Sequence, residues 1–332
     1  MSPRSAHAAP CLIFPTAVEN PRFGHVVHQV ARNTLRWYVR AARRFLGGHT
    51  VGLACVSVAR AAAHEGVITF RLASGGLVVV QASDRYWVLP LLLDRGYEPD
   101  LDWFLGTGMH SQDRFLDCGA NIGIWSVATS SVIHDPARVV AIEAGATSFA
   151  NLSRNAERNS DRFSVLHRAV SEMSGETVEF FSDDADTASA SLVQAMASSG
   201  AASEKVTTIS LAQLLASGSE PHEDALTFLK LDIEGMEDTV IGSCEPRLLD
   251  DVIVLYEDHG RDLESGTTRL LLERGFLVWL LLDDGAQSIT DAADLGWHKT
   301  DARKGYNLVA TRPEGRGSAR VTTALETARM AH

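Results

Sequence analysis

Cysteine is scarce in this chain, and the motifs of several common metal and cofactor sites are missing. The four cysteines, Cys11, Cys55, Cys118 and Cys244, are far apart and form no C-x-x-C pair. A disulfide framework or a zinc site is therefore not indicated, and the spacing suits a reducing cytosol. There is no H-E-x-x-H motif and no Cys/His cluster, so we expect no metal.

Long hydrophobic runs are also missing. The apolar run at 51–59 is too short to span a bilayer. No continuous hydrophobic segment follows a positively charged N-terminus, so a signal peptide is not indicated. The net charge of −12 over 332 residues argues against a nucleic-acid binder, which is usually basic. We expect a soluble, cytoplasmic protein without a transmembrane segment.

Positive charge is concentrated at the N-terminus. The first 60 residues contain eight arginines, no lysine and a single acidic residue, Glu19. Between His28 and Leu46, apolar residues and arginines recur at three- and four-residue steps, which predicts a helix. Its arginine-rich face would contact an anionic membrane surface or an acidic partner. The more usual alternative is a solvated helix face packed on the domain.

The rest of the chain shows strand and helix patterns in alternation. Val67–Leu72 and Leu77–Val80, joined by a glycine-containing turn, predict a β-hairpin. A lead-in helix around 101–105 follows, and then strands alternate with helices, the clearest of which are at 148–159 and 237–242. This alternation predicts an α/β fold with a doubly wound, mostly parallel, seven-stranded sheet. The predicted strands are Phe115–Asp117, Val139–Glu143, Ser164–His167, Thr227–Ile233, Val252–Glu257, Phe276–Leu282 and Tyr306–Thr311.

Two segments have weak signals of order. Asp183–Ser203 is rich in Ser, Ala and Asp, and would be either a mobile lid beside the site or a surface insertion. The tail Pro313–His332 is expected to fray, apart from a short helix at 323–330. We divide the chain into a basic, partly helical extension (1–60), a hairpin and lead-in helix (61–112), an α/β domain (113–312) and a flexible tail (313–332).

The first chemical motif follows the strand Phe115–Asp117. The strand ends in the acid Asp117, and Gly119, Asn121 and Gly123 follow in a turn that opens a helix. Glycines let a ligand approach the main chain, and the helix start offers unpaired N–H groups. The glycines are four apart, unlike the G-x-G-x-x-G of dinucleotide folds, and Asp117 would repel a pyrophosphate. A cationic ligand such as S-adenosylmethionine suits the turn better.

Glu143 ends the second predicted strand of the α/β domain, 26 residues after Asp117. An acid at that place can accept hydrogen bonds from both hydroxyls of a ribose. The alternative is that Asp117 and Glu143 only cap helices or turns. Together with Gly119 and Gly123, they favour a ligand site.

The second motif lies on the strand Thr227–Ile233. Strand alternation puts Lys230, Asp232 and Glu234 on one face. A central parallel strand is normally apolar on both faces, and buried charges without partners are costly. Charges are expected at the carboxyl end of such a strand, where α/β sheets form their binding crevice. Lys230 is either catalytic or a structural ion-pair partner of Asp232 or Glu234.

The third motif follows the strand Val252–Glu257. Glu257 and His259 share a face, and a histidine titrates near neutral pH, so His259 could accept a proton from a hydroxyl or an amine. A lone histidine is more often structural. Its position beside two other acidic strand ends makes the two interpretations about equal.

These motifs together resemble the FkbM-type methyltransferases, over about residues 97–311. The first 60 residues lie outside this resemblance. Two positions depart from the family pattern: Ala144 stands where the family usually has proline, and 211–215 lacks a usual acid. The motifs that carry the resemblance are Asp117-Cys118-Gly119-Ala120-Asn121-Ile122-Gly123, Ile142-Glu143, Asn151-Leu152 with Asn155 and Asn159, Ala169-Val170-Ser171, Leu229-Lys230-Leu231-Asp232-Ile233-Glu234-Gly235-Met236-Glu237 and Glu257-Asp258-His259.

The resemblance implies a Rossmann-like class I methyltransferase that uses S-adenosylmethionine, mostly on hydroxyls of natural products or sugars. We therefore expect a small-molecule acceptor, and the oligomeric state stays open. Two alternatives remain: a nicotinamide-dependent oxidoreductase on a similar sheet, and a methyltransferase fold that binds without catalysis. The expected cofactor-binding residues are Asp117, Gly119, Asn121, Gly123 and Glu143. The expected acceptor-facing residues are Asp232, Glu234 and His259, with Glu234 or His259 as base and Lys230 as the residue that orients them.

Overall fold

The structure is a computed structural model that describes residues 12–13, 15–19, 57, 60, 63, 66–93, 97–183, 186–191, 202–217, 224–283, 285–302 and 304–331. The helix predicted between His28 and Leu46, with most of the basic extension, lies outside the described residues. No helix among those described is long and apolar enough to cross a membrane.

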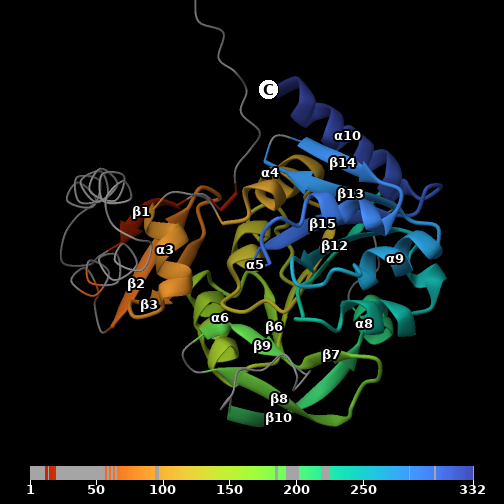
Figure 1. Cartoon of the computed structure of the whole chain (residues 1–332). Helices are drawn as coiled ribbons and strands as arrows, with labels where there is room; N and C mark the ends of the chain where they lie inside the picture. Colours follow the sequence, from red (N-terminus) through yellow and green to blue (C-terminus); the bar gives the residue numbers. More distant parts are fainter. Residues whose placement is uncertain are drawn as a thin grey trace, which may run out of the picture.

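The largest element is an eight-stranded sheet with the order β14-β13-β15-β12-β11-β4-β5-β6 (Figure 1). The five strands from β12 to β6 run parallel, whereas β15 is antiparallel to both of its neighbours. All seven predicted strands are present, and β14 adds an eighth at one edge. The strands are β4 (Arg114–Cys118), β5 (Val139–Glu143), β6 (Ser164–His167), β11 (Thr227–Leu231), β12 (Val252–His259), β13 (Leu277–Leu282), β14 (Gly285–Ile289) and β15 (Gly305–Thr311).

Helices cover both faces of this sheet, as expected for a doubly wound fold. Alternate strand residues enter two separate cores: Phe115 packs in one and Leu116 in the other, and the same holds for Phe228 and Leu229. The helices are α3 (Arg85–Leu93), α4 (Pro99–Gly108), α5 (Ile124–Thr129), α6 (Ala146–Arg158), α7 (Leu211–Ala216), α8 (Glu237–Ser243), α9 (Gly266–Glu273) and α10 (Arg316–Ala331), with 3-10 turns at Pro246–Leu249 and Ala292–Trp297.

The predicted hairpin is confirmed as β2 (Val67–Leu72) and β3 (Leu77–Gln81), with β1 (Pro15–Glu19) beside β2. The free edge of β3 meets two asparagines of α6. Asn155 accepts a hydrogen bond from the N–H of Val79 (2.7 Å) and Asn159 accepts one from Leu77 (2.8 Å), and both amides donate back to the strand. The asparagines thus complete an edge strand and fix the hairpin against the α/β domain.

A second sheet with the order β7-β10-β8-β9 lies near the carboxyl ends of β5 and β6 (Figure 1). Its strands are β7 (Ala169–Ser171), β8 (Thr177–Asp183), β9 (Asp186–Ser191) and β10 (Ala202–Ser210). The segment Asp183–Ser203, predicted as a lid or an insertion, is in part strand here. Residues 184–185 and 192–201 lie outside the described residues.

The C-terminal tail differs from the expectation of a flexible segment at 313–332. Arg316–Ala331 forms the helix α10, which packs on α4 and buries Val321, Ala324 and Ala328. Arg320 also donates a hydrogen bond to the buried carboxylate of Asp113 (2.8 Å). The apolar residues fall on one face at steps of three and four, and burial of that face outweighs the Gly, Arg and Ser content that suggested fraying.

The asparagine contact gives a stability prediction. Asn155→Ala should lower the free energy of unfolding by about 2–3 kcal/mol, because it leaves the buried N–H of Val79 and the oxygen of Ile122 without a partner. Urea denaturation measures the change. Glu157→Ala, at an exposed position of α6, is the control and should change stability by less than about 0.5 kcal/mol. Equal effects of the two substitutions would contradict this role.

Candidate functional site

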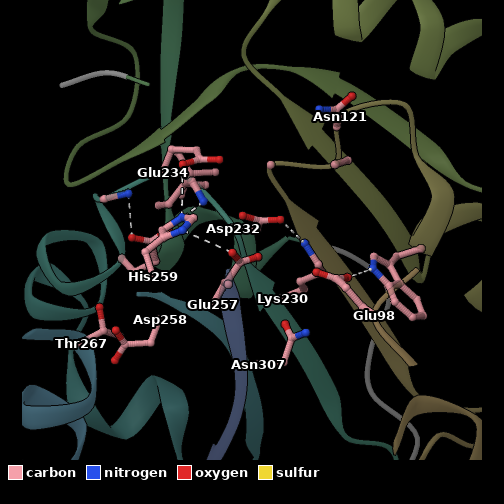
Figure 2. Close-up of a pocket in the computed structure, with 18 of the residues that line it drawn as sticks. Glu98, Asn121, Lys230, Asp232, Glu234, Glu257, Asp258, His259, Thr267 and Asn307 are labelled. Atoms are coloured by element: carbon pink, nitrogen blue, oxygen red, sulfur yellow. Dashed lines mark hydrogen bonds and ion pairs between the residues drawn. The ribbon is translucent and has the colours of Figure 1, made fainter. Parts of the chain in front are cut away.

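A cavity of about 960 Å³ opens where the parallel strands end (Figure 2). Its walls come from the loops after β4, β5, β11 and β12, from the start of α4, and from α3. The strand order turns back at β4, which has β11 on one side and β5 on the other. Open α/β sheets bind ligands at such a switch point. The fold therefore places the cavity where a ligand crevice is expected.

The glycine turn after β4 forms one wall. Gly119, Asn121 and Gly123 all have positive φ, of 79°, 50° and 83°. A Cβ at Gly119 would overlap the main-chain oxygen of Asp232, so the loops after β4 and β11 are in direct backbone contact. Gly119 and Asn121 line the cavity, whereas Gly123 packs against Leu152 behind it. The sequence pattern thus reflects a backbone that only glycine fits at Gly119 and Gly123.

Glu143 lies at the end of β5 and lines the cavity. Its two oxygens accept hydrogen bonds from the main-chain N–H groups of Asn121 and Gly145, both at 2.8 Å. Burial raises the pKa of Glu143 to about 7, although these backbone hydrogen bonds favour the charged form. A carboxylate has about four lone-pair sites, so Glu143 can accept a hydrogen bond from a ligand hydroxyl in addition to these backbone groups.

Asp117 is placed differently from the other predicted cofactor residues. It is 1% exposed and lies behind the residues that line the cavity. Ser126 Oγ donates a 2.6 Å hydrogen bond to its Oδ2, while Oδ1 is buried without a hydrogen-bond partner among the described residues. Burial raises the pKa of Asp117, and the nearby Lys230 ammonium opposes that shift. Asp117 therefore packs behind the cavity lining and does not itself line the cavity.

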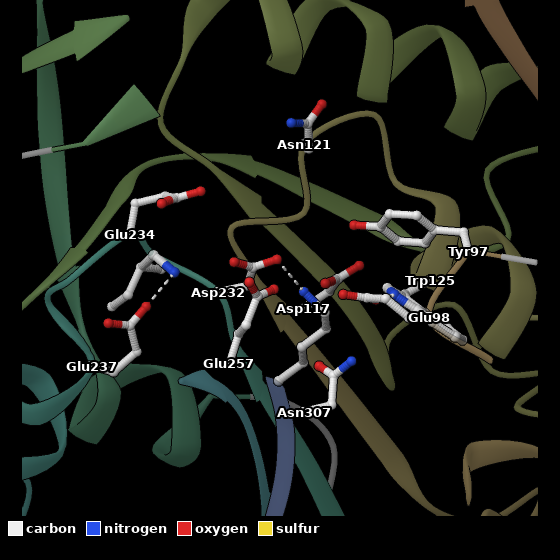
Figure 3. Close-up of polar contacts among 12 residues, drawn as sticks. Tyr97, Glu98, Asp117, Asn121, Trp125, Asp232, Glu234, Glu237, Glu257 and Asn307 are labelled. Carbon is white, nitrogen blue, oxygen red and sulfur yellow. Dashed lines mark hydrogen bonds and ion pairs between the residues drawn. The ribbon is translucent and has the colours of Figure 1, made fainter. Parts of the chain in front are cut away.

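Lys230 is a buried cation among the acids (Figure 2). Figure 3 shows the nearby carboxylates of Glu98, Asp117, Asp232 and Glu257. Its Nζ donates a 2.9 Å hydrogen bond to Asp232 Oδ2, one of the two ion pairs that the sequence left open. Burial alone would lower the pKa of Lys230, but Asp232, Glu98 and Asp117 together raise it above its usual value. Lys230 therefore stays charged and holds Asp232 in place.

The loop after β11 differs in detail from the prediction. The strand ends at Leu231, two residues earlier than expected, so Glu234 is carried by a turn with a φ of 53°. Glu237 fixes this turn, because its carboxylate accepts hydrogen bonds from the N–H groups of Ile233 (2.8 Å) and Gly235 (2.9 Å). Glu237 was not among the predicted site residues. In the sequence, Glu237 could have been identified as an acid two residues after Gly235, at the start of a helix.

His259 lies between two carboxylates (Figure 2). Its Nε2 is 3.2 Å from Glu234 Oε2 and its Nδ1 is 3.4 Å from Glu257 Oε1. The Glu234 carboxylate raises the pKa of His259 to about 9, against the opposing effect of burial, and Glu257 adds to the rise. This raised pKa favours the imidazolium form of His259 at neutral pH in the free protein.

Two acids at the centre were not predicted as site residues. Glu257 lies at the carboxyl end of β12, where its sequence signal was visible, and burial raises its pKa well above the usual value. Glu98 precedes α4 and accepts a 2.6 Å hydrogen bond from Trp125 Nε1, and burial raises its pKa to about 7. The sequence around Glu98 did not predict a site residue, because Glu98 precedes the alternating strands and helices of the α/β domain and reaches the cavity only in the folded structure.

Glu98, Asp232 and Glu257 form a group whose carboxylate oxygens lie within 4.8 Å of one another. Such oxygens are ligands that divalent cations accept. However, the Lys230 ammonium already lies 2.9 Å from Asp232. It neutralises part of the charge that a metal would otherwise balance.

Four aromatic rings form the wall opposite the β11 and β12 loops. The ring centroids of Trp87 and Tyr97 are 4.8 Å apart, those of Tyr86 and Trp87 are 4.9 Å apart, and those of Tyr97 and Trp125 are 6.4 Å apart. All four residues line the cavity. The sequence did not predict this wall, because Tyr86 and Trp87 lie in α3 and Tyr97 lies just before α4, outside the motifs at the strand ends.

The fold and the site together define a Rossmann-like α/β protein with an acid-lined ligand crevice at its switch point. Residues 117–278 match the family model described as "Methyltransferase FkbM domain". The chain thus carries an FkbM methyltransferase domain, and the resemblance seen in the sequence is confirmed.

Two further comparisons add little detail. No curated protein matches the chain. Among solved structures, one match is the precorrin-6y C5,15-methyltransferase of Geobacter metallireducens GS-15, with 11% sequence identity and a TM-score of 0.36. The match covers 61% of this chain and 81% of that one.

The His259 contacts give a prediction about pH. The imidazole should titrate near pH 9 rather than near 6.5, and Glu234→Gln should move the midpoint down. Because the folded-state pKa is raised, the contribution of the contact to stability is complete below about pH 6.5 and is lost as the pH rises through 9. Imidazole NMR resonances measure the midpoint. A value near 6.5 in the unchanged protein would contradict the contact.

Proposed function

We propose that this protein is an S-adenosylmethionine-dependent methyltransferase that methylates a hydroxyl oxygen of a small molecule, such as a natural product or a sugar. The observation that supports this most is the crevice itself: a glycine turn and Glu143 on one side face Asp232, Glu234 and Glu257 on the other. The FkbM methyltransferase domain covers both sides.

Asp117, Gly119, Asn121, Gly123 and Glu143 would hold the donor. Gly119 and Asn121 bring the main chain to the cavity surface, and the free lone pairs of Glu143 suit the two hydroxyls of a ribose. The buried Oδ1 of Asp117 is available to the donor's ammonium group, directly or through water. This donor set fits a cationic nucleoside better than a pyrophosphate.

Asp232, Glu234 and His259 would face the acceptor, together with Glu257. The bound donor supplies a methyl group on a sulfonium, so the acceptor's new oxygen–carbon bond forms as the carbon–sulfur bond breaks and a neutral thioether leaves. The protein has little covalent work to do, and positioning of the two reactants would supply most of the acceleration.

The acceptor hydroxyl must also lose its proton. We assign this role to Glu234, whose carboxylate lines the cavity on a turn that Glu237 fixes. His259 would remain a cation that orients Glu234 and Glu257, and Lys230 would orient Asp232. A general base of this kind contributes about 10²- to 10⁴-fold to the rate.

Donor binding separates this proposal from a nicotinamide-dependent oxidoreductase, and turnover separates it from a methyltransferase fold that binds without catalysis. Calorimetric titration should show binding of S-adenosylmethionine and none of NADH, and Glu143→Gln should weaken donor binding about tenfold or more through the loss of charge-assisted hydrogen bonds. Glu157→Gln, at an exposed position of α6, is the control and should bind normally. Binding of NADH would favour an oxidoreductase, and binding of neither ligand would contradict the proposal.

Measurement of turnover tests whether Glu234 acts as the general base. The purified protein, methyl-labelled donor and an extract of the source cells should give a labelled product. Glu234→Gln should reduce the rate of labelling by about 10²-fold or more while donor affinity changes less than about twofold. If Glu234→Gln lowers donor affinity as much as the rate, Glu234 belongs to the donor site instead. An unchanged rate would remove it from the proton transfer.

A further inference from the structure

The cavity has an excess of negative charge. Among the described residues that line it, Asp and Glu outnumber Lys and Arg twelve to four. Some of this charge is balanced inside the protein, since Lys230 pairs with Asp232, Lys299 pairs with Asp258, and His259 lies between Glu234 and Glu257. Arg168, Arg261 and Lys304 also line the cavity, and acids remain in excess after these cations and the internal pairs are counted.

The mouth carries acids from three separate segments. Asp262 and Glu264 follow β12, Asp238 lies in the first turn of α8, and Asp283 follows β13; all four are exposed. The loop of Asp262 is held rigidly, because the buried Lys299 ammonium bonds its main-chain oxygen and Asp258. In the part of the chain that the structure describes, no ion pair joins these four acids to a lysine or arginine.

The donor accounts for only part of this excess. S-Adenosylmethionine carries a sulfonium, an ammonium and a carboxylate at neutral pH, hence one net positive charge. It would contact the glycine turn and Glu143, on the other side of the cavity from Asp262 and Glu264. The acids of the mouth therefore face the space that the acceptor would enter, and they would favour a positively charged acceptor.

The aromatic wall also favours a positively charged acceptor. Cations bind over the faces of Trp and Tyr rings, and the attraction strengthens when water is excluded. The rings of Tyr86 and Tyr97 are at least partly exposed and pack on the buried Trp87, and the buried Trp125 donates a 2.6 Å hydrogen bond to the Glu98 carboxylate. A ring wall next to an acid suits an ammonium group. A neutral sugar would use the rings but not the acids.

We propose that the methyl acceptor is a small molecule that carries at least one ammonium group beside its hydroxyl, such as an amino sugar or an amino alcohol. The acids of the mouth and the aromatic wall would select it. This inference rests on the proposed methyltransferase function. We favour an ammonium over a divalent metal ion because Lys230 already places a cation at the centre of Glu98, Asp232 and Glu257.

The test uses the full chain saturated with S-adenosylhomocysteine, and calorimetry with kanamycin, glucose, glucuronate and magnesium chloride as probes. Kanamycin, a polycationic amino sugar, should bind, and its affinity should fall as salt is added. Glucose and glucuronate should not bind measurably. The double variant Asp262→Asn/Glu264→Gln should weaken kanamycin binding about tenfold and leave S-adenosylhomocysteine binding unchanged.

A matched control removes the same charge elsewhere. Glu172→Gln/Glu176→Gln changes two exposed acids outside the cavity lining and should leave kanamycin binding within about twofold. The inference is overturned if glucose binds as well as kanamycin, if both double variants weaken kanamycin equally, or if magnesium binds and kanamycin does not. Failure of S-adenosylhomocysteine itself to bind would instead contradict the proposed function.

Discussion

The site depends on one buried cation, the Lys230 ammonium at the end of β11. In the sheet register Lys230 lies beside Asp117 of β4, and its Nζ contacts Asp232. Carboxylates from three strand ends and from the start of α4 meet there, and they would repel one another without it. Breaking a buried pair costs far more than the pair contributes, so the lysine and its acids form one unit. The cavity can carry closely spaced acids because this cation lies among them.

Much of the fold was readable from the sequence, because its signals are local. Apolar runs that end in charge predicted the parallel strands, and the glycine spacing predicted a turn, which the structure shows with positive φ at both glycines. β14 was missed, since Gly285–Ile289 is a short edge strand with three exposed or partly exposed residues. α10 was underestimated because its burial depends on contact with α4, more than 200 residues earlier in the chain. Local patterns cannot report such distant contacts.

The candidate site, too, could be predicted only where its residues belong to local sequence motifs. The residues predicted from strand ends do meet at one cavity, although Asp117 and Gly123 support it from behind. Our proposal takes Glu234 rather than His259 as the base, because the folded structure places His259 between two carboxylates that raise its pKa. Glu98 and three of the four rings of the aromatic wall come from segments before residue 117, where the family model begins. The glycine turn, Glu143 and the acids after β11 and β12 all lie within the residues that match the family model.

The central claim is that the crevice at the ends of β4, β5 and β11 binds a methyl donor. A crystal structure with S-adenosylhomocysteine tests it most directly. The account predicts density for the ligand against the turn at 119–123, with the ribose hydroxyls on Glu143 and the amino acid end toward Asp117 and Glu98. Density elsewhere on the protein, or an empty crevice at saturating ligand, would contradict it.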